Sequence, residues 1–459
     1  MRDEVLHGST VSGGTVGGGT AERRDRLTVV LAYAVFVLVG IGAGVSGVLL
    51  LAQIRDYGVD QSTIGLTFFT GSAGFMVAGI ATGPMIHRYG TRAALFAAGA
   101  VFVAAALYIA THPPFVAYVL LQLLIGFATG TMESVLNAYL TALPNATTRL
   151  NRLHAFFGVG AVLGPLLATW MLTFTTWPKV SLVLAAICVP LTVGVLLTYP
   201  RMDRDPAARP AGGGSADGAS GDGARGALLT TALRQRGVLL GSVMLSVYVG
   251  LEIGVGNWAY SYLVDARTAT GLAAGYTVSG YWLGLTLGRF LISPAAARLR
   301  MTEVGLMYTC LAGVTAATAL TWLAPTAGVA AVGFVMLGFF LGPIFPTTMA
   351  VAPRLTVAPL VPTAIGVMNA GSVVGGSALP WLAGALAHGI GPWTLLPFAL
   401  ALALLQLAVW WRIVALRGFR PPAADAPPKP AAADGPAEPA AADEPAEPAT
   451  TDPAPTPQH

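Results

Sequence analysis

Long apolar runs separated by short polar segments dominate the chain. Each run of roughly twenty residues is long enough to cross a hydrocarbon core of about 30 Å as a helix. Twelve such runs can be distinguished, at 27–54, 62–86, 91–111, 114–143, 153–175, 178–199, 237–264, 271–293, 302–323, 326–352, 361–388 and 391–413. The pattern therefore predicts an all-α membrane protein with twelve transmembrane helices.

The composition supports a bilayer as the solvent. Hydrophobic residues make up 55% of the 459 positions and charged residues only 10%, whereas about a quarter of a soluble protein is charged. The only cysteines, Cys188 and Cys310, fall inside predicted helices, so neither a disulfide framework nor a thiol metal site is expected. We expect no cofactor.

Three polar segments divide the chain. We expect a cytoplasmic N-terminal tail at 1–26 rather than a removable signal peptide, and a cytoplasmic linker at 200–236 with a glycine-rich, flexible stretch. Residues 414–459 are mainly proline, alanine and acidic residues after position 420, and a disordered tail is predicted there. The six-helix bundles then occupy 27–199 and 237–413.

Basic residues are distributed unevenly between the two sides of the membrane, and the positive-inside rule then predicts both termini in the cytoplasm. That side receives Arg23, Arg24, Arg26, Arg88, Arg92, Arg149, Arg152, six arginines from Arg201 to Arg236, Arg298, Arg300, Arg354, Arg412, Arg417 and Arg420. The opposite side receives only Arg55, Lys179 and Arg267. The bias towards arginine, alanine and glycine suggests a high-GC bacterial genome, and hence a bacterial cytoplasmic membrane.

The two halves of the chain repeat each other. At an offset of 210 residues, Gly74 corresponds to Gly284, and at 212 Gly126 corresponds to Gly338. Further pairs at nearly the same offset are Gly40 with Gly250, Pro84 with Pro294, Arg88 with Arg298 and Gly164 with Gly375. Ordered matches at one offset predict two parallel six-helix repeats with a solute site between them.

A short loop motif separates the second and third runs. Gly83, His87, Arg88, Gly90 and Arg92 resemble the signature Gly-x-x-x-Asp-Arg-x-Gly-Arg-Arg/Lys of the major facilitator superfamily, with His87 at the position of the Asp. The glycines permit a tight turn, and the arginines can pair with helix ends and carboxylates as a gate. Alternatively, the arginines only obey the positive-inside rule.

Three charged side chains fall in the interior of apolar runs, away from the run ends, where burial of a charge is costly and functional sites are common. Glu133 shares a helix face with Asn137, which is placed to hold the carboxylate or the solute, and Glu133 is either a proton or solute group or a structural hydrogen-bond partner. Glu252 is the second acid. Arg289 is either part of a structural ion pair or a solute contact.

Aromatic and amide side chains accompany these charges. Aromatic faces stack on the CH faces of sugars, and amides bind hydroxyl groups. The candidate cavity residues are Asn257, Trp258, Tyr260, Trp282, Arg289 and Asn369. Tyr260 could equally belong to the aromatic belt at the membrane interface.

Three stretches carry a closer resemblance. Tyr248-Val-Gly-x-Glu252, His154-Ala-Phe-Phe-Gly-Val-Gly160 and Gly338-Phe-Phe-Leu-Gly342-Pro343 resemble the fucose–galactose–glucose:proton symporter family. The resemblance implies that Glu133 occupies the position of the family's helix 4 carboxylate, which is implicated in proton and sugar handling. The family's sugar symporters tend to carry an acid on helix 1. This chain has none there, and Glu252 is our hypothesis for the missing charge.

These observations favour secondary active transport by alternating access, namely proton-coupled uptake of a sugar-like solute, with drug or metabolite/proton antiport as the alternative. Lys179 and Lys429, the only lysines, lie outside any phosphate-binding loop, which excludes an ATP-driven pump of that type. The scattered embedded charges do not form an enzyme's catalytic cluster. The expected partners are a small solute, protons and the lipid bilayer. Nucleic acid is not expected as a partner, and the protein is expected to be monomeric.

Overall fold

A computed structural model describes residues 16–200 and 222–416. The expectations for the first fifteen residues, for the glycine-rich part of the linker and for the C-terminal tail fall outside these ranges. Within them the regular structure is helical and contains no strand. The predicted all-α class is confirmed.

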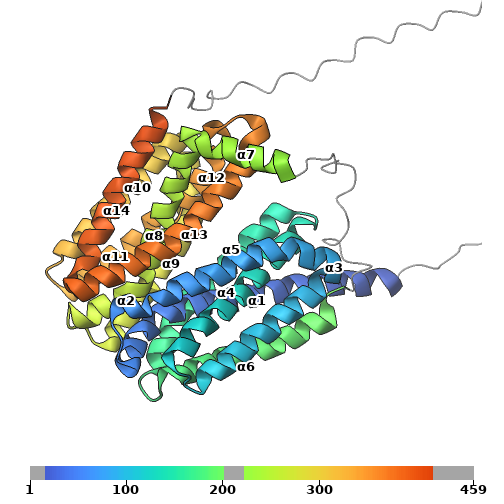
Figure 1. Ribbon diagram of the computed structural model, residues 1–459, viewed down its shortest axis with the longest axis horizontal. Helices are drawn as coiled ribbons and strands as arrows, with labels where there is room; N and C mark the ends of the chain where they lie inside the picture. The colour runs from blue at the N-terminus through green and yellow to red at the C-terminus, as the bar shows by residue number, and fades with distance from the viewer. Residues whose placement is uncertain (1–15, 201–221, 417–459) are drawn as a thin grey trace, which may run out of the picture. The chain divides into compact units, whose positions relative to one another are not determined.

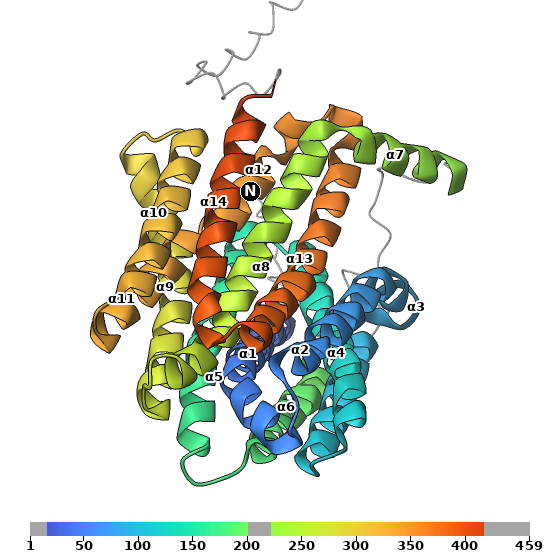
Figure 2. The same ribbon diagram turned by 60° about the vertical axis from the view of Figure 1, so that its left-hand side comes forward.

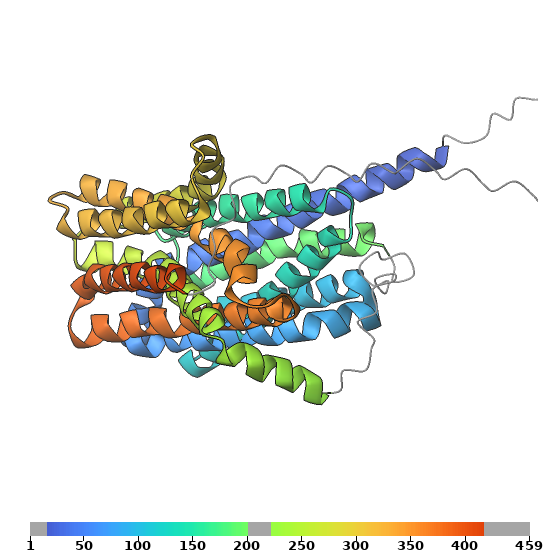
Figure 3. The same ribbon diagram turned by 90° about the horizontal axis from the view of Figure 1, so that it is seen from above.

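The helices of the first half, in blue to green in Figure 1, form one group, and those of the second half, in yellow-green to red, form another. The first group comprises α1 (Val16–Tyr57), α2 (Gln61–Ile64), α3 (Leu66–Ala110), α4 (Phe115–Thr141), α5 (Ala146–Met171) and α6 (Trp177–Thr198). After α7 (Asp222–Arg234), the second comprises α8 (Arg236–Asp265), α9 (Gly271–Arg298), α10 (Glu303–Leu323), α11 (Ala327–Leu341), α12 (Ile344–Leu355), α13 (Val361–Gly389) and α14 (Leu395–Val414). Most of them run along one common direction (Figure 3).

Ten helical segments in the described part of the chain are long and apolar enough to cross a membrane. One of them, Gln61–Ala110, contains both spans expected at 62–86 and 91–111, because a bend at Gly90 divides it. The remaining expected span is α9, whose polar residues and Arg289 make it less apolar. Counted in this way, the twelve predicted spans are all present as helices.

Glycines set the distance between neighbouring helices, and they do so in the same way in both halves. A Cβ atom on Gly74 of α3 would lie 2.0 Å from the carbonyl oxygen of Leu123 on α4. A Cβ atom on Gly284 of α9 would lie 2.1 Å from the carbonyl oxygen of Val335 on α11. Such close backbone approach requires glycine. The contact in the first half thus recurs in the second at the sequence offset of the repeat.

The two groups meet along α1 with α8, α5 with α9, and α2 and α3 with α13. We call the end of the protein with the α1–α2 connection the Arg55 end, and the end with the bend of α3 the Arg88 end. Helices α1 and α8 approach each other closely at Gly47, where a Cβ atom would lie 2.4 Å from the carbonyl oxygen of Gly256 and 2.9 Å from Cα of Asn257. Nearer the Arg55 end, Trp381 of α13 packs on Phe69 of α3 with ring centroids 5.9 Å apart.

Helix α7 was not expected from the sequence. It lies within the segment 200–236 that was assigned to the linker, and only Gln235 separates its last residue from α8. Figure 2 shows α7 extending away from the other helices, at an angle to α8. The segment therefore ends in a helix attached to the second bundle.

Candidate functional site

An ion pair joins two helices of the second half. A guanidinium nitrogen of Arg289 on α9 lies 3.2 Å from a carboxylate oxygen of Glu252 on α8, with side-chain exposures of 29% and 13%. The hydroxyl of Tyr281 donates to the backbone carbonyl of Glu252 at 2.9 Å. The hydroxyl of Tyr248 is buried and has no hydrogen-bond partner among the described residues. Two of the three embedded charges predicted from the sequence are thus partners.

The face of α9 that carries Arg289 packs against α5 of the other half. Residues 275, 279, 282, 286 and 289 recur at helical spacing and share one face. Along it, Gly275 packs on Thr169, the Ser279 hydroxyl donates to the carbonyl of Val162 at 3.0 Å, and Thr286 packs on Gly158.

Arg289 is the next residue along this face. The next turn of α5 carries His154, and the two side chains interact electrostatically. The Arg289–Glu252 pair therefore lies where the two halves meet.

Glu133 is half-buried on α4, in the first half. Its carboxylate has no hydrogen-bond or ion-pair partner among the described residues, and the charge of Arg289 acts on it from the other half. Asn137 donates from its side-chain amide to the backbone carbonyl of Glu133 at 2.8 Å. The amide therefore bonds its own helix and does not hold the carboxylate, which was one of the two roles expected for it.

The aromatic and amide candidates on α8 and α9 are buried rather than arranged around an open cavity. Trp258 donates from its indole nitrogen to the carbonyl of Pro380 at 2.8 Å, and Tyr260 is 8% exposed. Asn257 donates to the carbonyl of Ile253 at 2.9 Å. Asn369 of α13 is exposed, and neither of its side-chain atoms takes part in a hydrogen bond within the described ranges.

Several polar atoms are buried without a partner where the halves meet. They are the side-chain oxygen of Asn257, the indole nitrogen of Trp282, and the hydroxyls of Thr169 and Ser261, with no hydrogen-bond partner among the described residues. Such groups are uncommon, since an unpaired buried polar atom costs about 1–3 kcal/mol. Sequence reasoning singled out Asn257 and Trp282 but missed Thr169 and Ser261, because threonine and serine are ordinary in membrane helices.

A second ion pair joins the two halves at the Arg55 end. Arg55 of α1 and Asp265 of α8 are 2.9 Å apart, with side-chain exposures of 63% and 25%. The pair links the two halves and is open to solvent, so its contribution to stability is small, about 0–1 kcal/mol. The sequence placed Arg55 on the side with few basic residues but did not indicate its partner.

The loop signature lies at the opposite end and forms no ion pair in the part of the chain that the structure describes. Gly90 is buried with φ 78°, the left-handed conformation that glycine adopts readily. Gly83, His87 and Arg88 are exposed, and Arg92 is half-buried. Arg88 lies over the ring of Tyr89, 5.3 Å from its centroid. The tight turn expected from the glycine is present, whereas the gating role of the arginines stays a prediction.

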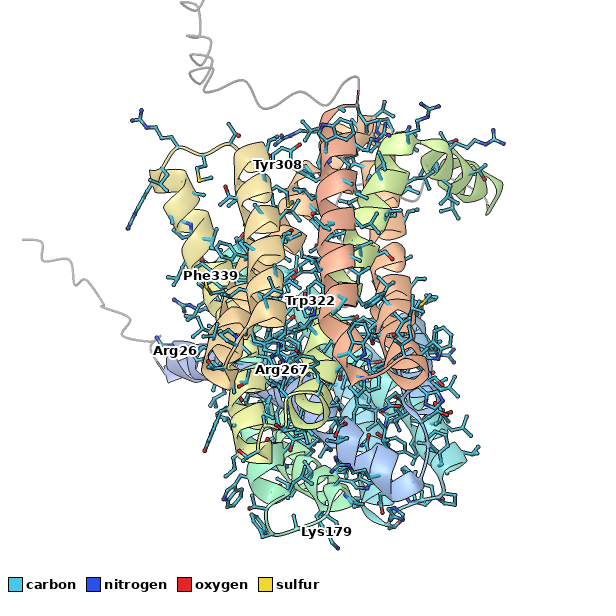
Figure 4. All side chains as sticks on the ribbon, turned by 90° about the vertical axis from the view of Figure 1, so that its left-hand side faces the viewer. Arg26, Lys179, Arg267, Tyr308, Trp322 and Phe339 are labelled. Carbon is cyan, nitrogen blue, oxygen red and sulfur yellow. The ribbon has the colours of Figure 1, made fainter. Side chains whose placement is uncertain are left out.

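Arg267 is held by backbone carbonyls and a tyrosine hydroxyl. Its guanidinium donates to the backbone carbonyls of Thr321, Trp322 and Ala324 at 2.7–3.1 Å and to the hydroxyl of Tyr262 at 2.7 Å. Figure 4 shows Arg267 beside Trp322. A cation at the C-terminal end of α10 satisfies carbonyls that the helix leaves open and complements its dipole.

The arrangement of two six-helix groups around embedded charges agrees with comparisons to known proteins. A family model described as Major Facilitator Superfamily matches residues 31–266 and 255–454. The chain belongs to this superfamily. It is therefore a multi-pass membrane transporter and not an enzyme, as the sequence predicted.

Among solved structures, a single-site mutant of the nucleoside transporter NupG is similar with a TM-score of 0.69 at 14% identity, covering 85% of this chain and 99% of that one. A D-xylose-proton symporter is similar with a TM-score of 0.63 at 14% identity, covering 83% and 97%. For a single-site mutant of the fucose:proton symporter FucP of E. coli the TM-score is 0.55 at 16% identity, covering 84% and 97%. These similarities establish the fold.

Curated relatives are distant in sequence. "Bypass of stop codon protein 6" of Saccharomyces cerevisiae is 23% identical over 80% of this chain and 78% of its own length. A glucose/galactose transporter of Brucella abortus is 25% identical over 57% of this chain and 62% of its own length. The glucose/mannose transporter GlcP of Bacillus subtilis is 22% identical over 71% and 80%. Relatives with sugar-transporter names confirm the resemblance that the sequence motifs indicated.

Proposed function

We propose that the protein takes up a sugar-like solute together with protons, and that Glu133 is the group that binds and releases the proton. The observation that carries the proposal is the placement of the embedded charges. Arg289 is paired with Glu252 in one half, and Glu133 of the other half, whose carboxylate has no hydrogen-bond or ion-pair partner among the described residues, interacts with the charge of Arg289. Relatives named for glucose, galactose and mannose support a sugar as the solute.

The charges suggest how a proton could be coupled to the solute. A carboxyl in a poorly hydrated environment favours its neutral form, and a nearby cation favours the ionised one. In the proposed mechanism, ionised Glu133 competes with Glu252 for the Arg289 guanidinium. Proton loss from Glu133 would then draw the two halves together around Arg289, and proton binding would release them.

The proposal also includes the orientation of the protein in the membrane and the bounds of its two bundles. The Arg88 end faces the cytoplasm of a bacterium, both termini are cytoplasmic, and the six-helix bundles span 27–199 and 237–413. In this orientation the Arg55 end, where the ion pair with Asp265 joins the halves, faces outward. Contact between the halves at that end is a feature of the inward-facing and occluded stages of alternating access.

The test is transport by the purified chain in lipid vesicles. Labelled glucose, galactose and mannose are supplied with the vesicle interior more alkaline than the outside. We expect accumulation by the wild type and loss of accumulation in Glu133→Gln, while exchange of labelled for unlabelled sugar persists because the substitution keeps the shape of the side chain.

Glu303→Gln is the matched control. Glu303 makes its ion pair with Arg354 at the start of α10, so the same chemical change outside the proposed site should leave accumulation intact. If Glu133→Gln still accumulates sugar with unchanged pH dependence, Glu133 is not the proton group and Glu252 is the next candidate. If the wild type moves cationic drugs outward and takes up no hexose, antiport is the function.

A further inference from the structure

Helix α7 is joined directly to a helix that crosses the membrane. It ends at Arg234, and α8, which crosses the membrane, begins at Arg236. Gln235 between them is extended, with φ −82° and ψ 120°. A single residue spans only about 3.5 Å, so chain connectivity holds the end of α7 close to the first turn of α8.

The two sides of α7 differ. Ala232 is fully buried where α7 packs on α13 and α8. At 100° per residue, Leu228 lies on one side of that contact line and Leu229 and Leu233 lie on the other, and these leucines are 40%, 46% and 44% exposed. We call these three residues the leucine face. At 100° per residue, Arg234 lies well away from Leu229 around the helix, about 140° from it.

We propose that the leucine face of α7 inserts into the boundary between head groups and acyl chains of an anionic bilayer, where Arg234 and Arg236 bind lipid phosphates. Exposed leucines at this depth match the apolar side of that boundary. The neighbouring arginines, both exposed, match its anionic side. Arginine can also extend its charged end towards the phosphates while its methylene groups stay in apolar surroundings. The inference depends on the membrane topology and not on the identity of the solute.

The anchor would have a mechanical consequence. Helix α7 packs on α13, and α13 also contacts α2 and α3 of the other half. If lipid holds α7 at the membrane surface, the second bundle would keep a fixed position relative to the bilayer while the other bundle moves.

The test measures the depth of single nitroxide labels in the full-length protein. Cys188 and Cys310, both buried and free, are replaced by alanine, and one cysteine is introduced at Leu229, Leu233 or Arg234. The labelled protein is placed in phosphatidylcholine vesicles containing phosphatidylglycerol. Collisions are measured with oxygen, which concentrates in lipid, and with a nickel chelate, which stays in water.

We expect oxygen collisions to exceed nickel collisions at 229 and 233, and the reverse at 234. Nickel access at 229 and 233 equal to that at 234 would show that the leucine face is in water and would overturn the proposal. Immobilised labels that neither reagent reaches would show that protein covers the face, which overturns it as well. Three positions are compared within one helix, so failure of one variant to fold leaves the test intact.

The lipid charge is tested separately. In the background with the label at 229, Arg234→Gln combined with Arg236→Gln should make the label shallower in vesicles with phosphatidylglycerol and change nothing in pure phosphatidylcholine. Arg298→Gln, an exposed arginine at the same end of the second bundle but outside α7, is the control and should have no effect. If the double substitution has the same effect in both lipids, phosphate binding by these arginines is refuted.

Discussion

Replacement of Glu252 by glutamine should destabilise the protein, because it leaves the Arg289 guanidinium without its anion. Loss of one partner from a buried ion pair costs about 3–5 kcal/mol. The exposed fractions of 29% for Arg289 and 13% for Glu252 allow partial hydration, which lowers the expected loss to about 2–3 kcal/mol. With six-helix halves of under two hundred residues, this corresponds to a fall in Tm of roughly 5–10 °C.

The assay is thermal unfolding of the purified protein in one detergent, with a double-mutant cycle. Arg289→Met alone leaves Glu252 without its cation, whereas the combined variant removes both charges. The loss of stability in the combined variant should be smaller than the sum of the two single losses by at least about 1 kcal/mol. Asp265→Asn, which breaks the solvent-exposed pair with Arg55, is the control and should lower Tm by no more than about 2 °C. Additive effects of the two single substitutions would refute the view that this pair holds α8 and α9 together.

Three further predictions concern packing, a helix end and topology. Gly74→Ala should destabilise the protein by about 1–3 kcal/mol in thermal unfolding, because its Cβ atom would meet a backbone oxygen at 2.0 Å. Gly79→Ala, with open space around it, should be neutral or stabilising. Equal effects of the two substitutions would contradict the packing argument. Arg267→Met should cost about 2 kcal/mol through the lost carbonyl contacts, measured in the same way, and an unchanged Tm would show that water replaces them. A cysteine at Ala266 should react with an impermeant reagent in intact cells and one at His87 only after permeabilisation, and the reverse pattern would invert the proposed orientation.

The apolar runs and the internal repeat were sufficient to predict a membrane protein of twelve helices in two halves. Twelve runs of the right length and a repeat at a nearly constant offset leave few other arrangements, since a membrane helix must satisfy its backbone within itself. The sequence did not indicate α7, because glycines and threonines interrupt its leucines and no apolar run marks the segment. Helix α7 packs on α13 and α8, and only the folded chain provides these contacts.

The sequence predicted which charged residues belong to the candidate site, but not which of them form an ion pair. Glu133, Glu252 and Arg289 stand out because charges in apolar runs are rare. The preference of Arg289 for Glu252 depends on the rotation of α8 and α9 about their axes, which the tight contact of Gly256 with the Trp282 ring helps to set. Side-chain spacing along one helix carries no information about such a contact between two.

The ion pair at the Arg55 end also bears on how the two halves of the protein evolved. Arg55 and Asp265 are 210 positions apart, and so are Gly47 and Asn257, which touch at the α1–α8 crossing. Each pair joins equivalent positions of the two repeats, so the crossing lies on the axis that relates them. In an ancestor built from two identical six-helix units, every residue on that axis would have faced its own copy, and two like charges would have repelled each other. An attractive pair at this position could form only after the duplicated halves had diverged in sequence.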